Sequence, residues 1–292
     1  MHNLVNWPNP YQQRDGGWLR GNLHAHSFPD SGCGTLPTEE VMARYEKAAY
    51  DFLAISNHMC LTPTSANRMV MLPGIEWNSD IGEHTGVYAL EAHTVAPACA
   101  ITRQVELLAD FSGSDRLLVL NHPDWQLRPH YRREELERAS GHDGIEIYNA
   151  LIRRLDGSAI STDKWDYLLS KERRTLGFAS DDSHIASDIG QGWIVLRAPQ
   201  RTPAAILRAI KCGNFYCSSG VVIADIRRTG NMIEIESEDG QEIQAIGSGG
   251  AQLCSVRDRS LSINLATIDS RYLRFQIYGA GATMAWTQPF FA

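Results

Sequence analysis

The sequence lacks the features of a membrane protein, a disulfide-stabilised secreted protein or a repeat array. No apolar run approaches the length of a membrane span, and the polar segment 1–13 contains no signal-peptide core. The six cysteines form no Cys-x-x-Cys pair, which favours reduced thiols over a disulfide framework or a zinc–thiolate site. No internal repeat or low-complexity tract is present. We therefore expect a cytoplasmic globular protein with no membrane partner.

An excess of positive charge is also missing. The net charge is −7, which argues against an extended nucleic-acid-binding surface. A short nucleotide held at a metal site remains compatible with this charge. The 292 residues, 43% of them hydrophobic, are enough for one large domain or two ordinary ones.

The sequence does contain a histidine pair at the end of a short apolar run. Residues 18–23 predict a strand that leads into His24 and His26, with Asp30 four residues further on. Residues two apart on an extended chain point the same way, so the two rings can face one metal ion. The pair alone could equally belong to a packed core. The ligand interpretation gains weight because histidines and carboxylates recur after other predicted strands.

The segments that follow alternate between strand and helix patterns up to about Ser219. Strands are expected at 52–56, 70–76, 87–90, 117–120, 145–149, 175–179 and 193–196. Helices are expected at 158–170, at 203–212 and after Thr38, which is a plausible N-cap. This alternation favours a parallel α/β arrangement.

Beyond Ser219 the pattern changes to short strands separated by glycine-rich turns. These strands are expected at 221–226, 232–236, 260–266, 273–278 and 283–286. No helix pattern is present, which predicts a small all-β appendage. We expect residues 1–219 to form a metallohydrolase barrel and 220–292 to form a C-terminal β-domain, which packs on the barrel, shapes one rim of the pocket or mediates self-association.

Side chains at the carboxyl ends of parallel strands meet on one face, where active sites lie. The predicted metal ligands at such ends are His24, His26, Asp30, His58, Glu76, His84, His122, Asp182 and His184. Nitrogen and carboxylate oxygen without a thiolate suit zinc, manganese or iron in a catalytic cluster. Nine ligands are too many for one ion and enough for two or three.

Several of these residues have other interpretations when taken singly. His122 could be a buried loop histidine, and His84 could be an exposed turn residue. Asp181 competes with Asp182, but only Asp182 has the two-residue spacing to His184 that places both side chains on one side.

Further polar residues are left open by the sequence. Glu146 and Asn149 could orient the ligands, or they could be a barrel-wall carboxylate and a strand cap. The histidines at positions 93, 130 and 142 are interpreted as surface or structural residues. Three arginines are candidates to contact a substrate phosphate, and the sequence selects none of them: Arg68, Arg128 and Arg153.

Five short motifs occur in a recognisable order: Leu23–His26, Ile55–His58, Pro73–Glu76, Asn121–Pro123 and Asp182–His184. As a set, the chain resembles the PHP (polymerase and histidinol phosphatase) superfamily of metal-dependent phosphoesterases over about residues 17–220. Three segments resemble its carbaryl-hydrolase-like branch, which carries a C-terminal β-appendage: Ile145–Asn149, Asn214–Gly220 and Ala285–Pro289.

The resemblance implies a distorted (β/α)7 barrel that holds up to three divalent metal ions. The implied ligand sets are His24, His26, Glu76 and Asp182 for the first ion, Glu76, His84 and His122 for the second, and Asp30, His58 and His184 for the third. Asn57 stands where the family usually has aspartate. This position lies beside the ligands, so we expect altered properties of the bound metals rather than loss of metal. The first motif is one residue short before Asp30.

The expected function is hydrolysis of a phosphate mono- or diester on a small molecule or short nucleotide. A metal-bridging hydroxide would attack phosphorus, so no side-chain nucleophile is assigned, and Asp182 and His184 would lie next to it. The alternative is a carbamate or carboxylic ester hydrolase on the same cluster. A non-catalytic metal-binding protein is disfavoured by the near-complete ligand set. The sequence leaves the substrate, the metal and the oligomeric state open.

Overall fold

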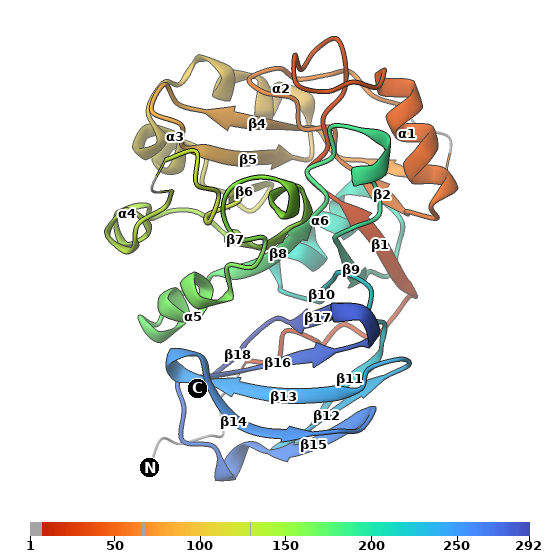
Figure 1. The fold of residues 1–292 in the computed structure, drawn as a ribbon, viewed down its shortest axis with the longest axis vertical. Coiled ribbons are helices and arrows are strands. Elements are labelled where there is room, and N and C mark those ends of the chain that lie inside the picture. The colour runs from red at the N-terminus through yellow and green to blue at the C-terminus, as the bar shows by residue number, and fades with distance from the viewer. Residues whose placement is uncertain (1–7, 66–67, 129) are drawn as a thin grey trace.

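A computed structural model describes residues 8–65, 68–128 and 130–292, which form a mixed α/β architecture (Figure 1). The helices in these ranges are α1 (Thr38–Lys47), α2 (Ala92–Val95), α3 (Gln104–Asp110), α4 (Arg133–Arg138), α5 (Thr162–Ser170) and α6 (Pro203–Lys211). Short 3₁₀ turns lie at Ala96–Ala100, Ala150–Arg154, Ala186–Asp188, Ser248–Gly250, Leu265–Thr267 and Ala280–Ala282. None of the described helices is both long and apolar enough to cross a membrane.

A five-stranded sheet supports one side of the region before residue 219. In spatial order its strands are β4 (Gly74–Asn78), β5 (His84–Ala89), β6 (Arg116–Leu120), β7 (Gly144–Asn149) and β8 (Leu176–Ser180). The first three pair antiparallel, and β6, β7 and β8 pair parallel. The parallel strands therefore end at a common edge, just before His122, at Asn149 and just before Asp181.

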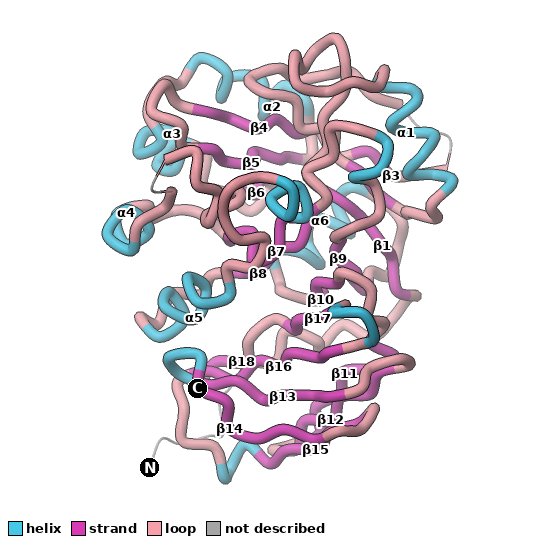
Figure 2. The backbone as a smooth tube through the Cα atoms, in the orientation of Figure 1, coloured by secondary structure: helices cyan, strands magenta, loops and turns pink. Residues whose placement is uncertain are grey.

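A ten-stranded sheet runs from the N-terminal strand into the C-terminal part of the chain (Figure 2). In spatial order it contains β14 (Ala251–Val256), β13 (Glu242–Gly247), β16 (Tyr272–Tyr278), β17 (Met284–Thr287), β10 (Phe215–Ser218), β9 (Trp193–Arg197), β1 (Trp18–Asn22), β2 (Phe52–Leu53) and β3 (Val70–Met71), while β18 (Phe290–Phe291) pairs with β16. Strands β1, β2 and β3 are parallel to one another, and the other pairs are antiparallel.

The C-terminal part is all-β apart from 3₁₀ turns. A separate sheet of β11 (Ile223–Thr229), β12 (Met232–Ser237) and β15 (Ser260–Asn264) shares a buried core with β13 and β16. Strand β17 pairs with β10 through Cys217 and Trp286, so hydrogen bonding continues across the expected boundary at residue 219. The division into two domains stays a prediction.

The described strands are divided between separate sheets, so the expected distorted (β/α)7 barrel is not confirmed. In the described residues the two larger sheets meet through isolated bridges, Ala25 with Ser183 and His58 with Glu76. The expected strand 70–76 is divided at Pro73, between β3 and β4. Proline has no N–H to donate to a ladder, so β3 ends before it and β4 pairs with β5 instead.

Other boundaries also differ from the sequence prediction. Helix α1 includes Thr38, and Pro37 is its N-cap, while the Thr38 hydroxyl lies 2.8 Å from the hydroxyl of Ser27. Helix α5 begins at Thr162, because the Ser158 hydroxyl bonds both the N–H and the C=O of Ile160 and forms a turn. Strands β10, β13, β14 and β18 were not predicted.

Residues near both ends of the described chain bond to the two larger sheets and to each other. The Tyr11 hydroxyl donates to the carbonyl of Phe215 at 2.9 Å and accepts from the N–H of Gln288 at 2.6 Å. The Gln288 amide forms two hydrogen bonds with the backbone of Gly177 in β8, at 3.0 and 2.8 Å. Tyr11 and Gln288 thus link the segments near the two ends of the described chain to β10 and β8.

A buried ion pair joins α5 to β16. Arg274 donates from Nε and Nη2 to the two oxygens of Asp166, at 2.8 and 2.6 Å. The Tyr272 hydroxyl donates to the same carboxylate at 2.8 Å. Arg274 is 2% exposed and Asp166 is 5% exposed. The pair therefore links the first part of the chain to the C-terminal sheet in a bidentate geometry shielded from water.

Candidate metal centre

The bridges between the two sheets position the first histidines. The N–H of His26 donates to the carbonyl of Ser183 at 2.9 Å, and the N–H of Ala25 donates to the hydroxyl of Ser56 at 3.2 Å. Because the chain is extended here, His24 and His26 project into the space between the sheets, and their Nε2 atoms lie 3.2 Å apart. Two buried imidazole nitrogens are thereby directed at one point.

Glu76 lies at the centre of the cluster and is 1% exposed. Imidazole nitrogens of five residues lie 3.0 to 3.3 Å from its carboxylate oxygens, those of His24, His26, His58, His84 and His122. Asn121 also donates to Oε1 at 2.9 Å. These groups exceed the roughly four lone-pair positions of a carboxylate. The donor set therefore fits cations held between Glu76 and the rings better than a network of hydrogen bonds.

The two oxygens of Glu76 face different groups of rings. Oε1 faces His24, His84 and His122, and Oε2 faces His26 and His58. Burial alone would raise the pKa of Glu76, but the rings of His24, His84 and His58 hold the pKa of this carboxyl well below its usual range. An ionised carboxylate with two separately surrounded oxygens suits a bridging ligand.

Asp182 completes the same side of the cluster. Its Oδ1 is buried without a hydrogen-bond partner, and it lies 3.1 Å from His24 Nε2 and 3.2 Å from His26 Nε2. Asp182 and His122 have positive φ angles of 50° and 28°, which non-glycine residues adopt rarely. An unpaired oxygen beside two imidazole nitrogens again fits a cation.

Asp181, the competing aspartate, has a structural environment. It accepts hydrogen bonds from the backbone N–H groups of Gly190, Gln191 and Gly192 at 2.6 to 2.9 Å, and one from the Tyr45 hydroxyl at 3.0 Å. The carboxylate thus fixes the loop 190–192 against α1. Asp182, as the spacing predicted, is the one of the two that reaches the histidines.

Glu146 and Asn149 hold the candidate ligands in place. Glu146 Oε1 lies 2.8 Å from His24 Nδ1, and its Oε2 accepts from the N–H of His122 at 2.7 Å. Asn149 Nδ2 donates to Glu146 at 2.8 Å and to Asp182 Oδ2 at 3.1 Å. A carboxylate behind a histidine orients the ring and raises the basicity of its other nitrogen. Of the two interpretations left open by the sequence, this geometry favours orientation of the ligands.

Asp30 is not brought into the cluster. Its side chain is exposed, and its Oδ2 accepts from the Thr62 hydroxyl at 2.6 Å. Asn57 donates to Thr62 Oγ1 at 2.7 Å and accepts from the N–H of Ser27 at 2.8 Å. Asn57 therefore fixes the loop after His26 rather than touching a ligand. The prediction that Asp30 binds a metal has no geometric support, because the turn after Ser27 directs it towards Thr62.

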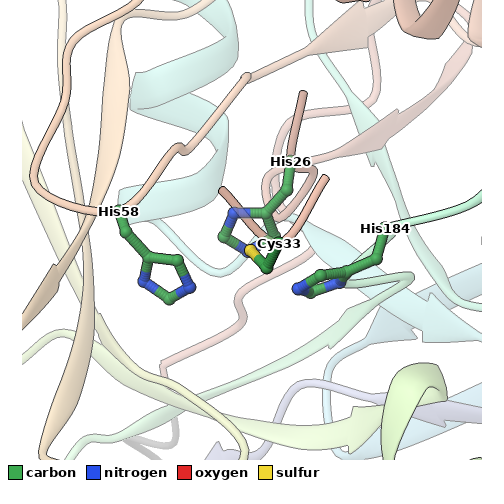
Figure 3. A group of neighbouring side chains, drawn as sticks. All are labelled: His26, Cys33, His58 and His184. Carbon is green, nitrogen blue, oxygen red and sulfur yellow. The ribbon is translucent and has the colours of Figure 1, made fainter. Parts of the chain in front are cut away.

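Cys33 takes the place that we expected Asp30 to fill. One ligand atom from each of His26, Cys33, His58 and His184 lies within 4.8 Å of the others (Figure 3). The sequence analysis missed Cys33 because it considered cysteines only as pairs. The available signal was a cysteine between Gly32 and Gly34, shortly after the first histidine motif.

The thiol of Cys33 should be unusually reactive when no metal is bound. Partial burial raises its pKa, but hydrogen bonds from His184 and His58 outweigh this and lower the pKa to about 5. We expect iodoacetamide to alkylate Cys33 in metal-free protein at pH 6, with the rate falling as the pH drops through about 5. Peptide mass spectrometry checks this, with exposed Cys212 as the internal reference. Equal or slower labelling of Cys33 at pH 6 would contradict the expectation.

One cavity lies at the cluster, and a second lies beyond His130. One of about 40 Å³ lies directly over the candidate ligands and has apolar walls from Trp125, Leu151 and Ile152. The other, of about 760 Å³, is lined by His130, two acidic residues and four basic ones, Arg128, Arg132, Arg133 and Lys164. The ring of His130 is 5.6 Å from that of His122 and 6.4 Å from that of Trp125. His130, interpreted from sequence as surface or structural, is therefore a buried residue between the candidate ligands and a basic cavity.

Comparisons with known proteins support the superfamily resemblance at the level of fold. The family profile described as PHP-associated matches residues 168–215. A two-domain protein from Bacteroides vulgatus containing a predicted PHP-like metal-dependent phosphoesterase aligns over 94% of this chain and 95% of its own, at 15% identity and a TM-score of 0.51. A lesion-specific endonuclease from Pyrococcus furiosus aligns over 67% of this chain and 56% of its own, at 12% identity and a TM-score of 0.53.

No curated protein sequence matches this chain significantly. At such low identities, the two structural likenesses show the fold alone. They do not show the carbaryl-hydrolase-like branch. What the site does chemically is therefore argued from its own residues.

Proposed function

We propose that this protein is a metal-dependent phosphoesterase that hydrolyses a phosphate mono- or diester of a small molecule or short nucleotide. The observation that carries the proposal is the arrangement around Glu76, whose two oxygens face separate groups of imidazoles. Such an arrangement suits two to three closely spaced divalent ions. The PHP-like phosphoesterase of the Bacteroides vulgatus protein supports the same chemistry.

When bound, these ions would neutralise charge on phosphoryl oxygens and lower the pKa of a bound water. The protein residues supply the rest. His24, His26, Glu76 and Asp182 hold one position, with His24 oriented by Glu146. Because these side chains are buried and already oriented, little reorganisation is needed when substrate binds.

The two cavities suit a substrate with a small reacting group and a larger anionic remainder. The cavity of about 40 Å³ has room only for a compact group at the metals, and its apolar wall limits access of bulk water. Of the three arginines considered from sequence, Arg128 lines the larger cavity, where basic residues outnumber acidic ones. A phosphate diester or a nucleotide would extend its second charged group into this cavity.

The reaction class can be tested with a substrate panel. Metal-reconstituted protein should cleave phosphate mono- or diesters faster than carbamates or carboxylic esters. Inorganic phosphate should compete with the substrate, because it resembles the group held by the cations. Steady-state rates with and without millimolar phosphate give the measurement. The proposal is wrong if phosphate does not inhibit and a carbamate or carboxylic ester is the much faster substrate.

A further inference from the structure

Cys33 lies beside His58 and His184, where we expected Asp30 to be the third ligand. We propose that Cys33 is a thiolate ligand of a separate metal position, formed with His58 and His184. The inference rests on the proposed function only in taking the cluster to be a metal site. It assigns one position a sulfur donor and therefore a metal preference different from that of its neighbours.

The geometry places the sulfur between two imidazoles. Figure 3 shows the thiol of Cys33 between the rings of His58 and His184, and ligand atoms of all three lie within 4.8 Å of one another. The Ser31 hydroxyl lies 2.9 Å from Cys33 Sγ, which fixes the thiol on the inner side of its loop. The sulfur is therefore held where it can share an ion with both rings.

His184 is prepared for this role by its backbone contact. Its Nδ1 lies 2.8 Å from the carbonyl oxygen of Asp182, which can only accept a hydrogen bond. The proton of a neutral His184 ring therefore sits on Nδ1, and Nε2 carries the free lone pair. A metal-binding histidine requires this arrangement, with the second nitrogen donating to a backbone carbonyl or carboxylate.

His26 lies close to the same group but is committed elsewhere. Its Nε2 is 3.3 Å from Glu76 Oε2 and 3.2 Å from Asp182 Oδ1, and its Nδ1 is 3.4 Å from the Ser31 hydroxyl. One ring nitrogen serves one ion. His26 Nε2 faces the carboxylates of both Glu76 and Asp182, whereas the contact of His58 Nδ1 is with Glu76 alone, so we assign His26 to the first position. The remaining donor set is one thiolate and two imidazoles. Three protein ligands leave a coordination position open, as in catalytic rather than structural zinc sites.

The sulfur donor predicts which metal this position selects. Thiolates favour zinc, iron or cobalt over manganese and magnesium, which prefer oxygen ligands. The positions around Glu76 and Asp182 have nitrogen and oxygen donors and do not share this bias. Manganese should therefore fill the position at Cys33 less readily than zinc does.

Cobalt(II) distinguishes a sulfur ligand from nitrogen and oxygen ligands without any activity assay. The full-length protein loaded with cobalt should show a near-ultraviolet sulfur-to-cobalt charge-transfer band in addition to visible ligand-field bands. Cys33→Ser should lose the charge-transfer band and keep ligand-field bands from the other positions. Cys33→Asp should bind more cobalt than Cys33→Ser, again without the band. Cys212→Ser, which changes another exposed cysteine, should keep the wild-type spectrum.

The outcomes separate this inference from the proposed function. Ligand-field bands without a charge-transfer band in the wild-type protein would overturn the role of Cys33 and leave the phosphoesterase proposal standing. No cobalt binding would overturn both. If Cys33→Ser does not fold, alkylation of the wild-type protein provides the answer. Zinc should protect Cys33 but not Cys212 from iodoacetamide, and equal labelling of Cys33 with and without zinc would refute the inference.

Discussion

Replacing Glu76 with glutamine is expected to lower kcat/KM for a phosphoester by about 10²- to 10³-fold, the scale of loss when one preorganised electrostatic group is removed. The amide has one oxygen where Glu76 has two, and its NH₂ group would face imidazole nitrogens within 3.0 to 3.3 Å of the present carboxylate. The substitution also removes the negative charge that would offset the repulsion between adjacent cations. Both the rate and the metal content should fall.

The measurement combines steady-state kinetics with elemental analysis of the reconstituted protein. Glu91→Gln makes the same chemical change at an exposed position and should retain wild-type rates and metal content. Circular dichroism shows whether the Glu76 variant is folded. A folded variant with normal metal content and a rate within about tenfold of wild type, a difference of about 1.4 kcal/mol, would remove Glu76 from the centre of the mechanism.

Arg274→Met is expected to destabilise the protein by about 3–5 kcal/mol, because it leaves the buried Asp166 carboxylate without its cation. Asp166 would keep only the Tyr272 hydroxyl among its present side-chain donors on β16. Urea unfolding followed by circular dichroism gives the free energy of unfolding. The double variant Asp166→Leu/Arg274→Met should recover part of the loss, because it removes the unpaired charge.

An exposed ion pair provides the control. Arg227 Nη2 lies 2.6 Å from Glu234, as close as the buried pair, but the Arg227 side chain is 53% exposed. Arg227→Met should therefore change stability little, because water already solvates both charges. Similar effects of Arg227→Met and Arg274→Met would show that burial does not set the strength of the link between α5 and β16.

The sequence predicted the candidate ligands that follow a simple local rule. His24 and His26, and Asp182 and His184, are two residues apart on extended chain, so their directions can be deduced without the rest of the fold. Glu76 was found because it ends an apolar run. Asp30 and Cys33 lie in a loop, where the turn determines which side chain points inward. The side-chain periodicity of strands and helices does not apply there.

The sequence patterns also could not predict which strands pair over long sequence separations. Pro73 divides β3 from β4, an effect visible in the sequence, but our prediction joined residues 70–76 into one strand because both sides of the proline are apolar. Strand β14 is mostly exposed, so it lacks the alternation of buried residues by which strands are recognised. The pairing of Cys217 with Trp286 depends on segments far apart in the sequence.

The bonds from Tyr11 and Gln288 to the sheets have a consequence for synthesis on the ribosome. Gln288 bonds to Gly177 in β8, β17 pairs with β10, and the N–H of Gln288 donates to Tyr11, so these contacts form only after residues 284–288 have been synthesised. Contacts of such long sequence separation form slowly. While the chain is being translated, the unpaired edge of β10 is exposed and open to pairing with other chains. The edge of β10 is therefore covered only after the residues of β17 have been synthesised.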